Sequence, residues 1–203
     1  MFERDIIGCD EAGRWCWAWP IFWAAVFIPE DKEIPDKIKD SKKLKEKDRE
    51  EMFDFIKNNY YYAISSISAE DIDSKWLQWA NKQVMIESTD KLIGILKENK
   101  INVNKTLIDW TLKFETFPTV WNSIIDWDAL IPQISAASIL AKVSRDFYLK
   151  ELSLIYPEYG FEKHKGYGTS LHTEKLNNHW VTKEHRLSYK PIKKILESRK
   201  EFK

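Results

Sequence analysis

The stretch that decides the fold is Ile6-Ile7-Gly8-Cys9-Asp10-Glu11-Ala12-Gly13-Arg14, near the start of the chain. Its apolar residues predict a short buried strand over 4–10, which leads into two adjacent acids. Gly13 then stands where a sharp turn favours a residue without a side chain. Because functional sites in open α/β sheets form where strands end, the acid pair is a candidate site.

Further strand and helix signals follow this first strand. A second apolar stretch predicts a strand over 20–28, and Ser68 is a predicted N-cap for a helix that starts at Ala69. The clearest helix runs from Ser135 to Ile155, where small residues alternate with larger apolar ones. This order predicts an α/β protein. The other predicted strands cover 60–67, 106–109 and 123–125, and the other predicted helices cover 45–56 and 84–95.

Length and composition limit the class of protein. The 203 residues provide for one domain, 1–203, in which residues from about 156 to 203 form a C-terminal helical part. No apolar run reaches the roughly 18 residues of a membrane span, and the N-terminus lacks the features of a signal peptide. We therefore expect a cytoplasmic protein without a membrane partner. The two cysteines, Cys9 and Cys16, are too few for a disulfide framework, and we interpret them as reduced packing residues.

The charge is zero overall but unevenly distributed. The segment from Lys142 to Lys203 contains 14 Lys and Arg against 8 Asp and Glu, together with all four His. A local basic surface of this kind favours nucleic-acid binding, although the molecule as a whole exerts no net attraction. A solvated basic helix face explains the same pattern equally well.

Acids also follow two later predicted strands. Asp109 ends one strand, and Asp126 and Asp128 lie beyond the next. Buried carboxylates are unfavourable unless a cation or basic side chains lie between them. Magnesium suits such oxygen donors, and two ions about 3.5–4 Å apart support phosphodiester hydrolysis. The alternative is that these are ordinary surface acids, since the chain holds 32 Asp and Glu.

Six ordered blocks of sequence extend the pattern over nearly the whole chain. In order and spacing they resemble the ribonuclease HII family, of the bacterial type, from about Asp5 to Pro191. The blocks are Asp10-Glu11-Ala12-Gly13-Arg14, Asp40-Ser41-Lys42-Lys43-Leu44, Ile108-Asp109, Asp128 with Ser135-Ala136-Ala137-Ser138-Ile139-Leu140-Ala141-Lys142-Val143, Lys165-Gly166-Tyr167-Gly168-Thr169, and His185-Arg186-Leu187-Ser188-Tyr189-Lys190-Pro191.

The resemblance implies a ribonuclease H-like fold, in which helices flank a mixed five-stranded sheet and a C-terminal helical extension helps to hold the duplex. It implies an endonuclease that hydrolyses the RNA strand of RNA–DNA hybrids and cuts 5′ of ribonucleotides embedded in DNA. Two Mg²⁺ or Mn²⁺ ions would be the cofactors, and the products would carry a 5′-phosphate and a 3′-hydroxyl. We expect a monomer whose partners are RNA–DNA hybrids and DNA that contains ribonucleotides.

The resemblance also implies which acids act. Asp128 is preferred over its competitor Asp126, because it keeps the family's seven-residue lead on Ser135. The catalytic and metal-binding acids of the family then correspond to Asp10, Glu11, Asp109 and Asp128.

Substrate contacts follow from the same resemblance. The family reads the ribonucleotide 2′-hydroxyl with the backbone of a Gly-Arg-Gly turn, which is Gly13, Arg14 and Trp15 here. A tyrosine that packs on the sugar at the RNA-to-DNA junction corresponds to Tyr167, for which a core position is the alternative. The candidates for phosphate contacts are Lys42, Lys43, Arg145, Lys165 and Arg186. A role in a surface salt bridge would explain any one of these basic residues equally well.

The chain holds ten Trp beside only six Gly, which inverts ordinary usage. Trp15, Trp19, Trp110 and Trp180 stand where the family pattern carries Gly, and Trp127 stands where bacterial relatives often have Gly. Glycine serves at such places because it adopts positive φ or lets a ligand approach, and an indole does neither. We hypothesise that a glycine codon has been translated as tryptophan. UGA is the obvious candidate, since genetic codes differ in reading it as Trp or Gly.

Other functions compete with this one. If the Trp residues are genuine, the chain is a catalytically weak or inactive protein that binds hybrids. The related ribonuclease HIII class is a second alternative, but the chain has no room for an extra domain before Asp10. A structural or protein-binding role would leave the ordered acid, Lys and Tyr blocks unexplained.

Overall fold

The computed structural model describes residues 5–39, 43–109, 117–123 and 131–200. Residues 1–12, 22–65 and 82–143 form one compact unit, called unit 1. Residues 13–21, 66–81 and 144–203 form a second compact unit, called unit 2. The organisation of 1–203 as a single domain stays a prediction.

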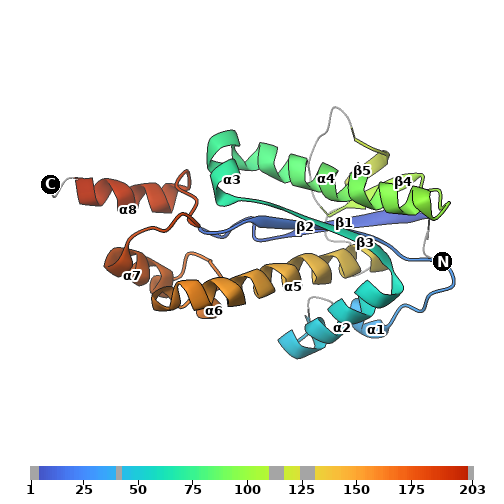
Figure 1. Ribbon diagram of the computed structural model, residues 1–203, viewed down its shortest axis with the longest axis horizontal. Helices are drawn as coiled ribbons and strands as arrows, with labels where there is room; N and C mark the ends of the chain where they lie inside the picture. The colour runs from blue at the N-terminus through green and yellow to red at the C-terminus, as the bar shows by residue number, and fades with distance from the viewer. Residues whose placement is uncertain (1–4, 40–42, 110–116, 124–130, 201–203) are drawn as a thin grey trace. The chain divides into compact units, whose positions relative to one another are not determined.

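A mixed five-stranded sheet carries the fold, as expected (Figure 1). Its strand order is β3-β2-β1-β4-β5, in which β1 is antiparallel to β2 and parallel to β4, and β4 is parallel to β5. The strand predicted over 123–125 begins earlier, at Val120, because its exposed residues carry a weak hydrophobic signal. The strands are β1 (Ile6–Ala12), β2 (Ile21–Phe27), β3 (Tyr61–Ile67), β4 (Lys105–Ile108) and β5 (Val120–Ser123).

The predicted helices are present, with shifted ends. The long helix begins at Pro132 rather than Ser135, since proline is well accommodated at the first helical position. The predicted N-cap is confirmed, because the Ser68 hydroxyl accepts the Asp71 N–H at 3.0 Å. Among the helices described, none combines the length and apolar character of a membrane span. The helices are α1 (Asp36–Lys39), α2 (Glu46–Asn59), α3 (Ala69–Lys75), α4 (Leu77–Glu98), α5 (Pro132–Ile155), α6 (Phe161–His164), α7 (Ser170–His179) and α8 (Lys190–Lys200), with a short 3₁₀ helix η2 (Pro157–Tyr159).

In unit 1, successive residues of β1 point to opposite faces of the sheet. Cys9 faces α4, where its sulfur lies 3.5 Å from the Thr89 hydroxyl oxygen. Gly8 faces α5, and a Cβ atom at Gly8 would lie only 2.4 Å from the backbone carbon of Gln133. Glycine at this position therefore allows α5 to approach the strand that carries Asp10. Figure 1 shows α4 and α5 on the two sides of the sheet.

The main core of unit 1 lies on the α5 side. Met52, Phe53 and Ile56 of α2 are buried there against the first half of α5, which confirms the apolar face predicted for 45–56. Strand β2 contributes Ala24 and Val26 to the same cluster. The strand that carries the acid pair is thus backed by a tightly packed layer.

Unit 2 brings together segments that are far apart in the sequence. The Trp17 N–H donates to the Gly166 carbonyl at 2.8 Å, and the Arg186 N–H donates to the Trp17 carbonyl at 2.8 Å. The rings of Trp19 and Phe161 meet edge to face, with centroids 4.2 Å apart. The C-terminal part predicted over 156–203 is therefore built around residues from the N-terminal region, and its duplex-holding role stays a prediction.

Candidate active site

Asp10 and Glu11 lie near the end of β1, in unit 1. Asp10 is only 9% exposed, and one of its oxygens accepts the Glu11 N–H at 2.8 Å. The Ser138 side chain on α5 also hydrogen-bonds to this carboxyl group. Asp10 follows Gly8 by two residues and therefore shares its face of the sheet, which explains the contact with α5.

The surroundings of Asp10 disfavour an isolated negative charge. Burial raises the pKa of Asp10 well above its ordinary value, and the neighbouring charge of Glu11 raises it further. The hydrogen bonds from Ser138 and from the Glu11 N–H act in the opposite direction. Two adjacent carboxylates, one of them buried, gain most from a cation placed between them. The surface-acid interpretation does not fit Asp10.

Asp109 directly follows β4, which lies beside β1 in the sheet. The two strands are parallel and pair Cys9 with Ile108, so one further step of this register places Asp109 beside Asp10. The Asp109 N–H donates to the Cys9 carbonyl at 3.3 Å, which extends the ladder by that step. Asp10, Glu11 and Asp109 thus lie at the same edge of the sheet of unit 1.

The carboxylates at this edge are hard oxygen donors, the type that Mg²⁺ and Mn²⁺ bind. Asp128, the fourth predicted acid, and its competitor Asp126 lie outside the described residues. Within the part of the chain that is described, no three His, Cys, Asp or Glu side chains form a ready group for a metal ion. The donor chemistry and the burial of Asp10 fit a divalent cation, and the complete set of ligands stays a prediction.

The predicted substrate-reading residues Gly13, Arg14 and Trp15 form a turn in unit 2. Gly13 has a φ of +98°, which favours glycine, and its carbonyl accepts the Cys16 N–H at 3.2 Å. The Arg14 guanidinium lies 4.6 Å from the centre of the Trp15 ring. Trp15 is 66% exposed, so the turn presents an indole where the family pattern has glycine.

Arg186, a predicted phosphate contact, is fully buried inside unit 2. Its guanidinium donates to the carbonyl oxygens of Gly13 and Arg14, both at 2.8 Å, and to the Trp19 carbonyl at 2.8 and 2.9 Å. These partners are backbone atoms of the turn and of the segment that follows it. A contact between Arg186 and a phosphate of the substrate stays a prediction. The burial of its guanidinium does not favour that contact.

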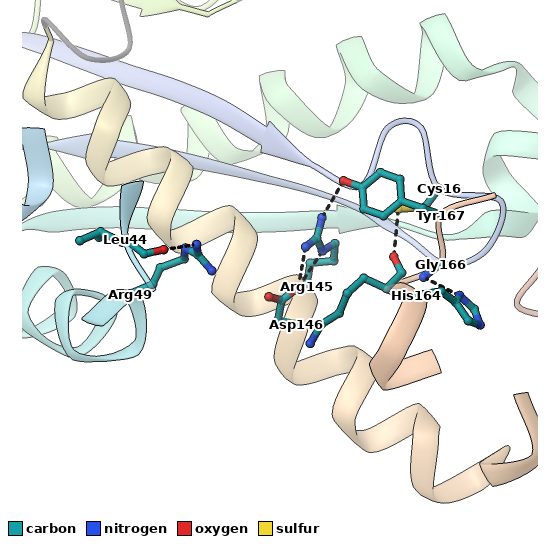
Figure 2. Close-up of polar contacts among 9 residues, drawn as sticks. Cys16, Leu44, Arg49, Arg145, Asp146, His164, Gly166 and Tyr167 are labelled. Atoms are coloured by element: carbon teal, nitrogen blue, oxygen red, sulfur yellow. Dashed lines mark hydrogen bonds and ion pairs between the residues drawn. The ribbon is translucent and has the colours of Figure 1, made fainter. Parts of the chain in front are cut away.

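Tyr167 and Arg145 contact each other in unit 2 (Figure 2). Arg145 donates to the Tyr167 hydroxyl at 3.3 Å and forms an ion pair with Asp146 at 2.6 Å. Tyr167 is 41% exposed, which argues against the core position considered above. Arg145 is buried, so its predicted phosphate contact competes with these internal partners.

The predicted phosphate-binding lysines are a mixed set. Lys43 is exposed before α2, whereas Lys42 lies outside the described residues. Lys165 is partly buried after α6, with a φ of +48°, and its carbonyl accepts a hydrogen bond from the Cys16 thiol at 3.4 Å. Their role in phosphate binding stays a prediction.

Three residues near these sites were not among the predicted site residues. Ser138 contacts Asp10, the Tyr189 hydroxyl donates to the Arg14 carbonyl at 2.7 Å, and Asp73 accepts the N–H groups of Leu187 and Ser188. Ser138 and Tyr189 belong to the sequence blocks that resemble the family, which was a signal for them. Asp73 lies in an ordinary helical stretch, and no local pattern marks it.

Comparisons with known proteins point to one family. A family model described as Ribonuclease HII matches residues 7–192. A Ribonuclease HII from Fusobacterium nucleatum subsp. nucleatum is 39% identical over 199 residues, which cover 98% of this chain and 90% of the relative. A Ribonuclease HII from Bacillus cereus strain B4264 is 43% identical over 193 residues, which cover 95% of this chain and 71% of the relative.

Solved structures show the same fold. The ribonuclease H2 from Pyrococcus horikoshii OT3 has a TM-score of 0.79 at 24% identity, with 96% of this chain and 98% of that one covered. The structure of Bst-RNase HIII in complex with Mn²⁺ has a TM-score of 0.78 at 17% identity, with coverages of 97% and 70%. At these identities the likeness concerns the fold, which is ribonuclease H-like.

Proposed function

Because this chain belongs to the ribonuclease HII family, and is thus a metal-dependent endoribonuclease of the ribonuclease H type, we propose that it cuts 5′ of ribonucleotides embedded in DNA as well as within RNA–DNA hybrids. The products carry a 5′-phosphate and a 3′-hydroxyl. The observation that carries the proposal is the buried Asp10 beside Glu11, with Asp109 at the end of the neighbouring parallel strand.

In this proposal Asp10, Glu11, Asp109 and Asp128 would hold two Mg²⁺ or Mn²⁺ ions. Such ions, when bound, would supply activation of a water molecule and stabilisation of the leaving oxygen of the phosphodiester. The chain's own contribution is to hold the carboxylates in place. Ser138 and the Glu11 N–H orient the Asp10 carboxyl, and the β1–β4 ladder aligns Asp109 with it. Support for a manganese ion comes from the related fold of Bst-RNase HIII, which was solved with Mn²⁺.

Unit 2 would supply the recognition of the substrate. The backbone of Gly13, Arg14 and position 15 would read the 2′-hydroxyl, the group that distinguishes RNA from DNA. The exposed ring of Tyr167 would pack on the sugar at the RNA-to-DNA junction. Lys42, Lys43 and Lys165 would contact phosphates.

Cleavage of a labelled DNA duplex with a single ribonucleotide tests the proposal. The assay compares Mg²⁺ with Mn²⁺, and the chain as printed with a version that carries Gly at all ten Trp positions. We expect a cut 5′ of the ribonucleotide that disappears in the Asp10→Asn variant of whichever version is active. If neither version cuts but both bind the hybrid, the chain is the inactive binding protein. Equal cutting by the Asp10→Asn variant would contradict the assigned chemistry.

We further propose that the protein is a cytoplasmic monomer. Light scattering after size-exclusion chromatography, at micromolar concentration, tests the monomer, and a mass twice that of the chain would contradict it.

A further inference from the structure

The buried Arg186 is bound to the substrate-reading turn by an unusually complete set of hydrogen bonds. Its guanidinium reaches the carbonyls of Gly13, Arg14 and Trp19, and Nη1 also lies 2.7 Å from the Tyr189 hydroxyl oxygen. Arginine is suited to this task because its planar fork holds several donors in fixed directions. The buried positive charge of Arg186 is thus compensated by hydrogen bonds to main-chain carbonyl oxygens.

Tyr189 and Asp73 complete this arrangement. The Tyr189 hydroxyl donates to the Arg14 carbonyl at 2.7 Å, so that carbonyl accepts bonds from both Arg186 and Tyr189. The Asp73 carboxylate accepts the N–H of Leu187 at 2.6 Å, and the N–H and hydroxyl of Ser188 at 2.9 and 2.5 Å. Asp73 therefore fixes Leu187 and Ser188, the short segment between the two residues that hydrogen-bond to the turn, Arg186 and Tyr189.

We propose that Arg186 and Tyr189 are positioning residues for the Gly13–Arg14 turn. Because they hold both carbonyls of the turn from inside the protein, the turn has one conformation before substrate arrives. Preorganisation of this kind adds to affinity by removing the ordering that binding would otherwise require. The inference rests on the proposed reading of the 2′-hydroxyl by this turn.

The test measures a ratio of affinities in the absence of divalent ions, so that no cleavage occurs. Binding of a DNA duplex with one ribonucleotide is compared with binding of the all-DNA duplex of the same sequence. The full chain as printed and its Trp15→Gly variant both serve as parents. Tyr189→Phe removes one hydroxyl and should lower the ratio about 2- to 10-fold, the effect of one hydrogen bond. Tyr148→Phe is the matched control, because its hydroxyl bonds to Glu184 at 3.0 Å; it should leave the ratio unchanged.

The outcomes separate this inference from the proposed function. Arg186→Lys should lower the ratio more than Tyr189→Phe, and where it fails to fold, Tyr189→Phe decides alone. A folded Tyr189→Phe variant with the parental ratio would overturn the positioning role. Parents that show no preference for the ribonucleotide would overturn the proposed reading of the 2′-hydroxyl itself.

A second, independent observation concerns the backbone at three tryptophans. Among the described residues, five that are not glycine have a positive φ. Three of these five are tryptophans: Trp19 (+72°), Trp76 (+70°) and Trp180 (+77°). The ψ values of Trp76 and Trp180 are 144° and −170°, in a region that is essentially restricted to glycine. A side chain as large as indole is strained in these conformations.

Two of these positions are also typical places for glycine. Trp76 directly follows α3 and Trp180 directly follows α7, and a positive φ at the point where the chain leaves a helix favours glycine. The Trp76 side chain is 75% exposed, so burial does not compensate for its strain. Trp19 differs because its ring is buried against Phe161, although its φ has the same sign.

We infer that positions 19, 76 and 180 are glycine in the protein as its source cell makes it. A codon read as tryptophan in one genetic code and as glycine in another would account for all three, and for the ten Trp beside six Gly. The inference adds position 76, which the family pattern did not indicate.

Thermal unfolding of the full printed chain tests the strain. Trp76→Gly and Trp180→Gly should each raise the midpoint by about 2 °C or more. Trp79→Gly is the matched control, because Trp79 is also exposed but lies within α4 and has Lys75 4.7 Å from its ring centre. It should lower the midpoint, since glycine destabilises a helix.

Mass spectrometry of peptides from the native protein decides the identity of all three residues. We expect glycine at 19, 76 and 180. Tryptophan at any of the three, or a lower midpoint for both Trp76→Gly and Trp180→Gly, would overturn the inference.

Discussion

The Nε2 atoms of His172 and His185 lie 3.1 Å apart in the interior of unit 2. The Thr182 N–H donates to His185 Nδ1 at 2.9 Å, so His185 carries its proton on Nε2 and donates to His172. His172 in turn donates from Nδ1 to the Tyr167 carbonyl at 3.0 Å. Backbone groups at both ends thus require two neutral rings, and the chain of bonds ends on the residue proposed to touch the sugar.

This histidine pair predicts loss of stability in mild acid. Burial lowers the pKa of His172 to about 3 and that of His185 to about 4, against 6.5 for an ordinary histidine. The unfolded chain therefore binds protons first as the pH falls below 6.5, and the stability present above that pH is lost towards pH 4. Each histidine contributes up to about 1.4 kcal/mol per pH unit in this window. Urea unfolding between pH 7.5 and 4.5 measures the effect.

The control for this prediction is His179, which is exposed at the end of α7. His179→Gln should keep the parental dependence on pH, whereas His172→Gln should weaken it. A free energy of unfolding that does not change from pH 7 to 5 would contradict the prediction.

Removal of the Ser138 hydroxyl should weaken metal use. Ser138→Ala leaves the Asp10 carboxyl less well oriented, and loss of such a supporting hydrogen bond typically reduces metal affinity or activity about 10- to 100-fold. The measurement is the Mg²⁺ or Mn²⁺ concentration at half-maximal cleavage. Ser153→Ala on the same helix is the control, because Ser153 bonds only to the Leu149 carbonyl of its own helix among the contacts described. An unchanged ion requirement in Ser138→Ala would exclude this supporting role.

A methyl group at Gly8 should destabilise unit 1. The added Cβ would lie 2.4 Å from backbone atoms of Gln133 and Ile134, so α5 would have to move away from β1. Overpacking of this kind costs about 1–3 kcal/mol. Gly94→Ala is the matched control, since a Cβ there meets nothing within 4 Å, and it should stabilise α4 by about 0.4–1 kcal/mol. Chemical denaturation of both variants checks the opposite signs.

The ring of Tyr167 should matter more than its hydroxyl. Tyr167→Ala removes the exposed face proposed to pack on the sugar and should raise KM about 10-fold or more, a typical effect of losing one stacking contact. Tyr167→Phe removes only the 3.3 Å bond from Arg145 and should change KM by less than about 3-fold. Steady-state cleavage of the single-ribonucleotide duplex distinguishes them, and equal KM values for the two variants would contradict the packing role.

Much of the sheet was predictable because its signals are local. The apolar residues of β1, the two acids near its end and the acid that follows β4 all appear within a few residues of sequence. Strand β5 was placed too late because it is exposed and has little apolar pattern. The ordered blocks then predicted the family, which the comparisons confirm.

What the sequence by itself determined was therefore the class of chemistry: carboxylates at strand ends, in the order of one family of nucleases. Only the tertiary structure decided that Arg186 lies inside unit 2, where it donates hydrogen bonds to the backbone carbonyls of Gly13 and Arg14. It also decided that Asp73 accepts a hydrogen bond from Ser188, close to Arg186 in the chain. The same is true of the strained backbone at Trp76, a position that the family pattern did not indicate. The physical reason is that hydrogen bonds between segments distant in the chain, and the φ and ψ angles that close packing imposes, leave no periodic trace in the order of residues.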